Sequence, residues 1–275
     1  MPAVFGLNVI NVVPPTGPIR LWDCQTEWAR IEKQRGAYDF SLLDSLVNAA
    51  GKRSIMLVLG HPPAWAAKGG PDGLQASWMT PGSNRPPASM DDFKKYVNAV
   101  VTRYKGKIDC YQVWNEPADK RFYSGSWNDL GTIVKTAYKE IKRIDPFAKV
   151  ISPPLQPRRQ AGWSVKGAAI IKALNDAGLP FDIWSCHIYP QQGEGLDGFK
   201  RDCVLVKDAI SGTKKPLWIT ESNYNLGGQG NPYPIRKQIG MKELTKTACT
   251  QLDIPRMYWY AYQYSNPALL AINSF

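Results

Sequence analysis

Two glutamates follow apolar segments of the chain at positions where acid–base chemistry is possible. Glu116 ends the stretch "CYQVWNE", and Glu221 ends the stretch "PLWITE". Both stretches are short and rich in aromatic and β-branched residues, which is typical of buried strands. Two carboxyl groups across one pocket can cleave a glycosidic bond, because one protonates the leaving oxygen while the other attacks the anomeric carbon or activates water.

The pair carries this hypothesis, because a single glutamate at a strand end is more often a surface or ion-paired residue. Asn115 directly precedes Glu116, and Pro117 ends the stretch. A strand that finishes in an amide beside a carboxylate is poorly suited to close a core. It is well suited to hold an acid over a ligand.

Eight apolar segments alternate with amphipathic helical patterns along the whole chain. The expected strands cover residues 4–10, 18–23, 54–60, 109–115, 149–153, 181–189, 216–221 and 256–262. The expected helices cover residues 41–52, 90–105, 127–145, 167–178, 199–211 and 235–252. This alternation predicts repeated β/α units and a parallel sheet. Eight strands without a glycine-rich phosphate loop favour a closed (β/α)₈ TIM barrel over an open doubly wound sheet.

The two ends of the chain depart from an ideal barrel. Only residues 11–17 separate the first two expected strands, which predicts a degenerate first helix, and residues 263–275 are too few for a complete eighth helix. We therefore expect one catalytic barrel over residues 1–275, which could be a part of a longer polypeptide.

Two long segments without helical period, 61–89 and 222–233, follow strands and are expected on the C-terminal face, where such barrels carry their chemistry.

Charge and hydropathy argue against nucleic-acid and membrane partners. The net charge is +11, but many basic residues lie in helical patterns such as 91–107 and 134–145, which indicates solvated helix faces. No run of about 18 apolar residues is present, so no membrane span is predicted. The first residues lack the basic segment and cleavage site of a secretory signal, and the compartment stays open, with an extracellular site of action as one alternative.

The cysteines and histidines predict neither a disulfide framework nor a zinc site. The five cysteines are odd in number, widely spaced and without a C-x-x-C pair, which favours buried free thiols. Only His61 and His187 could supply imidazole ligands. The reaction is accordingly expected to need no metal or other cofactor.

Four short motifs resemble those of the clan A glycoside hydrolases. They are "WNEP" at 114–117, "HIYP" at 187–190, "WITES" at 218–222 and "YWY" at 258–260. Within that clan, residues 20–47 and 57–66 are similar to glycoside hydrolase family 39 and its bacterial exopolysaccharide-cleaving relatives. The similarity covers nearly the whole chain, in order.

The resemblance implies roles for individual residues. Glu116 matches the general acid/base, and Glu221 matches the nucleophile of a retaining mechanism. Asn115 matches the amide that binds the 2-hydroxyl of the sugar. Tyr189 matches the residue that orients the nucleophile, and Arg20 matches the basic residue that keeps the nucleophile ionised.

Five further residues are candidates for contact with the sugar. His187 and His61 either contact the substrate or are packed, hydrogen-bonded core residues, and the family pattern favours His187 at the mouth. Trp259 matches the aromatic floor under the sugar, although a core tryptophan is the alternative. Trp65, like Trp78, could extend the sugar platform.

The leading hypothesis is a retaining glycoside hydrolase that acts as a monomer, in endo fashion, on a polysaccharide or oligosaccharide substrate. The first alternative is a catalytically silent carbohydrate-binding barrel. Because both carboxylates are present, the sequence favours the enzyme. A nucleic-acid binder, suggested only by the net charge, is the second alternative.

Overall fold

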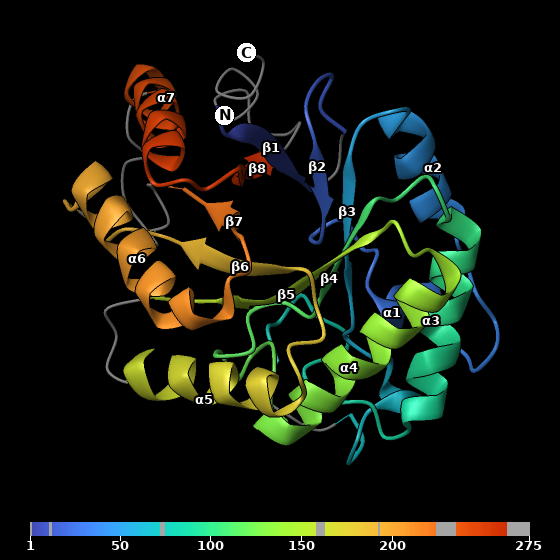
Figure 1. Cartoon of the computed structure of the whole chain (residues 1–275). Helices are drawn as coiled ribbons and strands as arrows, with labels where there is room; N and C mark the ends of the chain where they lie inside the picture. The colour runs from blue at the N-terminus through green and yellow to red at the C-terminus, as the bar shows by residue number, and fades with distance from the viewer. Residues whose placement is uncertain are drawn as a thin grey trace.

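The computed structural model describes residues 2–10, 13–71, 75–157, 163–191, 193–223 and 235–262. Eight parallel strands form a closed barrel in which each strand pairs with the next along the chain and the last pairs with the first (Figure 1). They are β1 (Val4–Val9), β2 (Ile19–Leu21), β3 (Ile55–Leu59), β4 (Cys110–Val113), β5 (Lys149–Leu155), β6 (Ile183–Ile188), β7 (Leu217–Ser222) and β8 (Arg256–Tyr262). The predicted (β/α)₈ barrel and its eight strands are confirmed.

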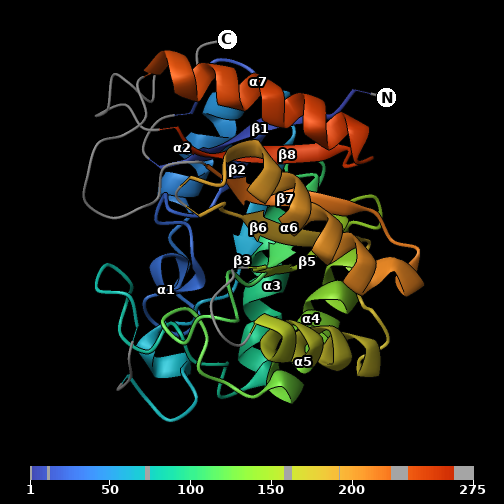
Figure 2. The ribbon, with the colours of Figure 1, turned by 90° about the vertical axis from the view of Figure 1, so that its left-hand side faces the viewer.

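Helices surround the barrel on its outer side, as two views at right angles show (Figures 1 and 2). The long ones are α2 (Ser41–Ala50), α3 (Met90–Tyr104), α4 (Trp127–Ile144), α5 (Trp163–Asp176), α6 (Gly195–Ile210) and α7 (Ile235–Gln251). The short ones are α1 (Trp28–Ile31) and the 3₁₀ helices η1 (Ala64–Ala66) and η2 (Ser211–Thr213). All six predicted helices are present. The sequence did not predict α1, because four residues are too few to show a helical period.

The ends of the barrel can be compared with the sequence only in part. The described residues between β1 and β2 form no helix, in agreement with the degenerate first helix. The expected truncation of the eighth helix falls on residues 263–275, which lie outside the described residues.

The helix α4 shows how the sequence fixes an element against the barrel. At its start, Ser126 Oγ accepts a hydrogen bond from the Asp129 backbone N–H (3.1 Å), and Asp129 in turn accepts one from the backbone N–H of Ser126 (3.4 Å). This reciprocal cap satisfies N–H groups that the first turn leaves without helical partners. The helix then buries one apolar face, formed among others by Leu130, Val134, Ala137 and Ile141.

Strand periodicity divides the barrel interior into an apolar and a polar layer. Near the strand starts, six buried side chains form a separate cluster, which we call the base cluster: Met56, Cys110, Ile151, Ile183, Trp218 and Tyr258. Two residues further along three of these strands lie the buried polar residues Gln112, Ser185 and Thr220. Because side chains in a strand repeat with period two, the residues of each pair share the inner side.

The remaining predictions about composition can be compared with the structure. All five cysteines are buried and free, as expected. Within the described part of the chain, none of the helices combines the length and the apolar character that a membrane crossing requires.

Candidate active site

Arg20 is the centre of a buried polar network at the mouth of the barrel. Its guanidinium is fully buried and donates four hydrogen bonds. The acceptors are Asn8 Oδ1 (2.8 Å), Gln112 Oε1 (2.8 Å), Asn115 Oδ1 (2.8 Å) and Glu221 Oε1 (2.6 Å). A buried charge is costly unless it is paired and hydrogen-bonded, and Arg20 meets both conditions. It thereby links β2 to β1, to β7 and to the end of β4.

Gln112 holds this network from below. Its side-chain amide donates to Ser185 Oγ (2.9 Å) and Thr220 Oγ1 (3.1 Å), which lie on β6 and β7. With its nitrogen engaged there, the amide oxygen faces Arg20. These hydrogen bonds cross the barrel from β4 to β7. They fix the position of Gln112, and through Arg20 they help to fix the carboxyl group of Glu221.

Both oxygens of the Glu221 carboxylate are held in place. Oε1 accepts from Arg20, and Oε2 accepts from the Tyr189 hydroxyl (2.7 Å). Burial, together with the negative charges of Glu221 and Glu116, raises the pKa of Tyr189 well above its ordinary value. Tyr189 therefore stays a neutral donor. The carboxylate of Glu221 is thus held by Tyr189, predicted to orient it, and by Arg20, predicted to keep it ionised, and both roles stay predictions.

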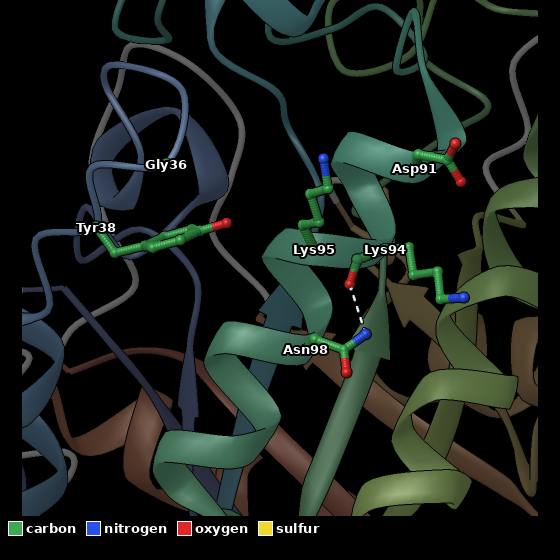
Figure 3. Close-up of a pocket in the computed structure, with 6 residues that line it drawn as sticks. All are labelled: Gly36, Tyr38, Asp91, Lys94, Lys95 and Asn98. Carbon is green, nitrogen blue, oxygen red and sulfur yellow. Dashed lines mark hydrogen bonds between the residues drawn. The ribbon is translucent and has the colours of Figure 1, made fainter.

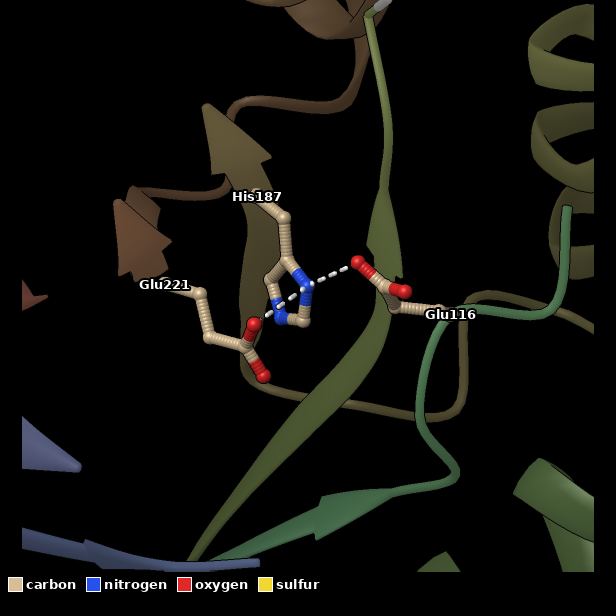
Figure 4. Close-up of side chains that lie close together, drawn as sticks. All are labelled: Glu116, His187 and Glu221. Atoms are coloured by element: carbon tan, nitrogen blue, oxygen red, sulfur yellow. Dashed lines mark hydrogen bonds and ion pairs between the residues drawn. The ribbon is translucent and has the colours of Figure 1, made fainter. Parts of the chain in front are cut away.

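Glu116 lies beside Glu221, with His187 between them (Figure 4). His187 Nδ1 is 2.9 Å from Glu116 Oε1 and 3.4 Å from Glu221 Oε2. One ligand atom from each of the three residues lies within 4.8 Å of the other two. The structure thus brings together the two carboxylates that the sequence could only place on one face.

The chain leaves β4 with a backbone conformation that is unusual for residues with side chains. Trp114 has φ +71° and Glu116 has φ +40°, both in the left-handed region. Such conformations cost free energy and are concentrated at functional sites. Here they turn Asn115 and Glu116 towards the mouth: Asn115 reaches Arg20, and Glu116 reaches His187.

His61 is packed between two tryptophans. Its ring centroid is 4.5 Å from that of Trp22 and 4.6 Å from that of Trp114, and its Nδ1 is 3.1 Å from the Ser83 carbonyl oxygen. Burial lowers the pKa of His61 to about 3, so the ring is neutral at ordinary pH. The preceding Gly60 has φ +128°, and a Cβ there would lie 2.6 Å from the Trp114 ring. Of the two interpretations, these contacts favour a packed histidine.

Trp259 and Trp65 lie in different surroundings. Trp259, on β8, is fully buried, with its ring centroid 6.1 Å from that of Phe5. Trp65, in η1, donates from Nε1 to the Glu32 carbonyl oxygen (3.1 Å) and packs edge-on against Trp28, with ring centroids 6.0 Å apart. Among the described contacts, none joins Trp65 to either carboxylate. Both roles in sugar binding stay predictions.

Two residues that the sequence did not single out also belong to the mouth. The Tyr260 hydroxyl, on β8, contacts Asp23 Oδ2, two residues after β2. Burial, followed by the charge of Glu221, raises the pKa of Asp23 to about 7. The signal for Asp23 was available, because it follows a strand end as Glu116 does. Tyr260 had only its place beside Trp259.

A separate cavity of about 590 Å³ lies between the segment 36–38 and α3 (Figure 3). Its lining includes Tyr38, Lys94, Lys95 and Asn98, and Asp91 is the one acid among the lining residues. A single carboxylic acid beside two lysines cannot supply the paired acid and base of the mouth. The candidate active site is therefore at the mouth of the barrel.

Comparisons with known proteins place similar sequences among polysaccharide-cleaving enzymes. A model of the family described as "Glycosyl hydrolase family 10" matches residues 22–198. "Endo-1,4-beta-xylanase C" of Phanerodontia chrysosporium is 27% identical over 238 residues, covering 82% of this chain and 55% of the xylanase. "Endo-1,4-beta-xylanase B" of Thermotoga neapolitana is 26% identical over 222 residues, covering 78% and 60%. The chain spans about half the length of the curated relatives it matches.

Solved structures share the fold at low sequence identity. A glucosidase from Croceicoccus marinus has a TM-score of 0.73 at 14% identity, covering 98% of this chain and 63% of its own. A family 10 xylanase of Thermobacillus composti has a TM-score of 0.67 at 14% identity, covering 96% and 86%. A family 39 glycoside hydrolase from Bacteroides cellulosilyticus WH2 has a TM-score of 0.65 at 18% identity, covering 99% and 59%. At these identities the likeness extends to the barrel fold alone.

Proposed function

Because the chain belongs to glycosyl hydrolase family 10, we propose that it cleaves glycosidic bonds within a polysaccharide by a retaining mechanism. Family membership agrees with the clan A resemblance of the sequence motifs. The narrower resemblance to family 39 is not confirmed, since a family 39 enzyme is similar in fold alone. The curated relatives named above are endo-1,4-beta-xylanases, so we propose a β-1,4-linked xylan backbone as the substrate.

The single observation that carries the proposal is the closeness of the two carboxylates. Oxygens of Glu116 and Glu221 lie within 4.8 Å of each other. In retaining enzymes the two carboxyl groups are about 5 to 5.5 Å apart, whereas inverting enzymes need about 6.5 to 9.5 Å to accommodate a water molecule. This close spacing supports direct attack by one carboxylate.

The first step of the proposed reaction forms a glycosyl-enzyme. Glu221 attacks the anomeric carbon while Glu116 gives its proton to the leaving glycosidic oxygen. The bond from the anomeric carbon to that oxygen breaks with its electron pair, and a bond to a Glu221 oxygen forms. Arg20 and Tyr189 orient Glu221 for this attack, because each holds one carboxylate oxygen.

The second step returns the enzyme to its starting state. Glu116, now deprotonated, removes a proton from a water molecule, and the resulting hydroxide displaces Glu221 from the anomeric carbon. His187, 2.9 Å from Glu116, supports the change of roles, because its Nδ1–H can donate to the carboxylate once the proton has left. Two inversions at the anomeric carbon retain its configuration.

Asn115 is suited to hold the sugar during both steps. Its oxygen accepts from Arg20, which can only donate, so this contact fixes the orientation of the amide. The Asn115 nitrogen is then the group that can donate to the sugar 2-hydroxyl. Such a contact strengthens as the oxocarbenium-like transition state forms.

A mechanism-based label tests the proposal. Incubation with a 2-fluoro xyloside should add one sugar mass to the protein, and peptide mapping should place the label on Glu221. Soluble xylan should yield a mixture of oligosaccharides, as expected for internal cleavage. The reaction should need no added cofactor, and the protein should act as a monomer. A label on another residue would contradict the assigned nucleophile. Binding of xylan without label or turnover would instead favour the catalytically silent barrel.

A further inference from the structure

We propose that Glu116, His187 and Glu221, here called the mouth trio, also form a binding site for a divalent transition-metal cation such as Zn²⁺. The sequence predicted no such site, because it contains only two histidines. The fold supplies a set of three ligands that the number of histidines did not predict, because two carboxylates converge on one imidazole. Metal binding does not depend on the proposed function, whereas the inhibition that follows from it does.

The distances within the trio are close to those between ligands of one zinc ion. Zinc bonds of about 2.0 to 2.2 Å in tetrahedral geometry place neighbouring ligand atoms about 3.3 to 3.6 Å apart. His187 Nδ1 is 3.4 Å from Glu221 Oε2, within this range, and 2.9 Å from Glu116 Oε1, shorter than the range. The two carboxylate oxygens lie within 4.8 Å of each other. Side-chain rotations that move the ligand atoms by a few tenths of an ångström to about one ångström would therefore complete the site.

The chemistry of the donors also favours a borderline cation. One imidazole nitrogen and two carboxylate oxygens are typical zinc ligands, and a fourth position would remain for water. Among the described residues, Arg20 is a competing cation, but it binds Glu221 Oε1, whereas the proposed ligand atom is Oε2. Oε2 also accepts from Tyr189 and keeps a second lone pair for the metal.

Among the ion pairs of the described residues, two ionised carboxylates of the trio face one guanidinium, which leaves the trio attractive to a cation. All three trio side chains are buried, so a bound ion would be shielded from bulk water. In the metal-bound form Nδ1 of His187 binds the ion through its lone pair, with the ring proton on Nε2, and the proton of the Glu116 carboxyl group leaves to the solvent.

Within the described part of the chain, this is the one group of three potential ligands found so close together. The other histidine, His61, is enclosed by Trp22 and Trp114. The five cysteines are all buried, and burial raises the pKa of each thiol, which disfavours the thiolate that binds zinc. A stoichiometry of one ion per chain is therefore expected.

The bound ion would block catalysis under the proposed function. It would lie between the two carboxylates, where the scissile glycosidic oxygen must enter. It would also bind Oε2 of Glu221, the proposed nucleophile, and Oε1 of Glu116, the proposed acid, and so engage both groups at once. Inhibition should thus compete with substrate and be reversed by a chelator.

Calorimetric titration of the whole chain with ZnCl₂, after removal of chelators, tests the site directly. We expect one ion per wild-type chain, and weaker binding in both His187→Asn and Glu116→Gln. Loss of an outer-shell partner costs about 10- to 100-fold in metal affinity, and loss of a ligand should cost at least as much. His61→Asn is the matched control, because it removes the other histidine and should leave zinc affinity unchanged.

Melting curves and a diffraction experiment complete the test. Each variant should melt cooperatively without metal, which excludes unfolding as the cause of lost binding. Anomalous scattering at the zinc edge should place the ion within bonding distance of the trio. Unchanged affinity in both trio variants, equal loss in His61→Asn, or an ion located elsewhere would overturn the proposal. Absence of glycosidase activity would reject the proposed function and leave the binding result interpretable.

Discussion

The base cluster and the polar layer around Arg20 occupy the same barrel only two residues apart on several strands, yet they differ in chemistry. The base cluster is apolar and makes contacts that many side chains of similar volume could replace. The polar layer consists of hydrogen bonds between named atoms, in which each donor faces a specific acceptor. Substitutions in the base cluster should therefore change the free energy of unfolding little, whereas substitutions in the polar layer should lower it strongly. Catalysis should depend on the polar layer.

The largest effect is expected from Glu221→Gln. The amide keeps the volume but cannot form the glycosyl-enzyme, so kcat should fall on the order of 10⁴-fold or more. Initial rates on xylan and on an aryl xyloside measure the loss. Because Arg20 loses its charged partner, the melting temperature should be recorded as well. Substantial turnover by the folded variant would remove Glu221 from the role of nucleophile.

The second effect concerns Glu116→Gln and depends on the leaving group. General acid catalysis contributes about 10²- to 10⁴-fold, and a glycosidic oxygen of natural xylan needs the proton. An activated aryl leaving group departs without it. The loss of kcat/KM should thus be much larger on xylan oligosaccharides than on a dinitrophenyl xyloside. Equal losses on both substrates would assign another group as the acid.

The third prediction tests the cost of disturbing the polar layer. Arg20→Met leaves Glu221 buried without its ion pair, and breaking a buried pair costs about 3 to 5 kcal/mol in the free energy of unfolding. Arg201→Met is the matched control, since Arg201 pairs with Glu194 at the partly exposed surface and should cost about 1 kcal/mol or less. Chemical denaturation measures both. Similar losses in the two variants would mean that burial of the Arg20 network matters little.

The sequence predicted the fold well because its signals are local. Runs such as "IMLVL" at 55–59 are apolar throughout, as expected for a strand covered on both sides, and the helices carry a clear amphipathic period. The closeness of Glu116 and Glu221 was also predictable, because strand ends of a parallel barrel share one face, while their catalytic roles stay a proposal. Tyr189 and Arg20 could be assigned only through the family resemblance, and the structure places both on Glu221.

Other parts of the site depend on contacts that sequence spacing does not encode. Gln112 reads as one polar residue inside an apolar strand, and only the closed barrel shows that it reaches Thr220, 108 residues away. The spacing of residues along the sequence also does not reveal that His61 is enclosed by Trp22 and Trp114. Tyr260 belongs to the "YWY" motif, but the motif does not reveal its contact with Asp23, which lies near the other end of the chain.

The fourth prediction uses Asp23, whose pKa in the folded protein is about 7, above its ordinary value of about 3.9. A raised pKa means that the folded state holds the proton more tightly than the unfolded state. The stabilisation is complete below about pH 4 and is lost as pH rises through about 7. Asp23→Asn cannot ionise, so from pH 4 to pH 8 its stability should improve relative to wild type by about 1 kcal/mol or more. Parallel pH profiles of the two melting temperatures would show that Asp23 ionises normally.

The smallest effect is expected from Ile151→Val in the base cluster. Ile151 is fully buried and pairs in register with Ile183 on the neighbouring strand, so the change removes one methylene from a packed interior. The cost should be about 0.5 to 1.5 kcal/mol in the free energy of unfolding. Turnover should stay within about twofold of wild type at a temperature well below the transition, because a small cavity in the apolar base leaves the hydrogen bonds of Gln112, Arg20 and Glu221 unchanged. A loss of kcat much larger than this, in a variant that still melts cooperatively, would show that the two layers are coupled and that the base also positions the nucleophile.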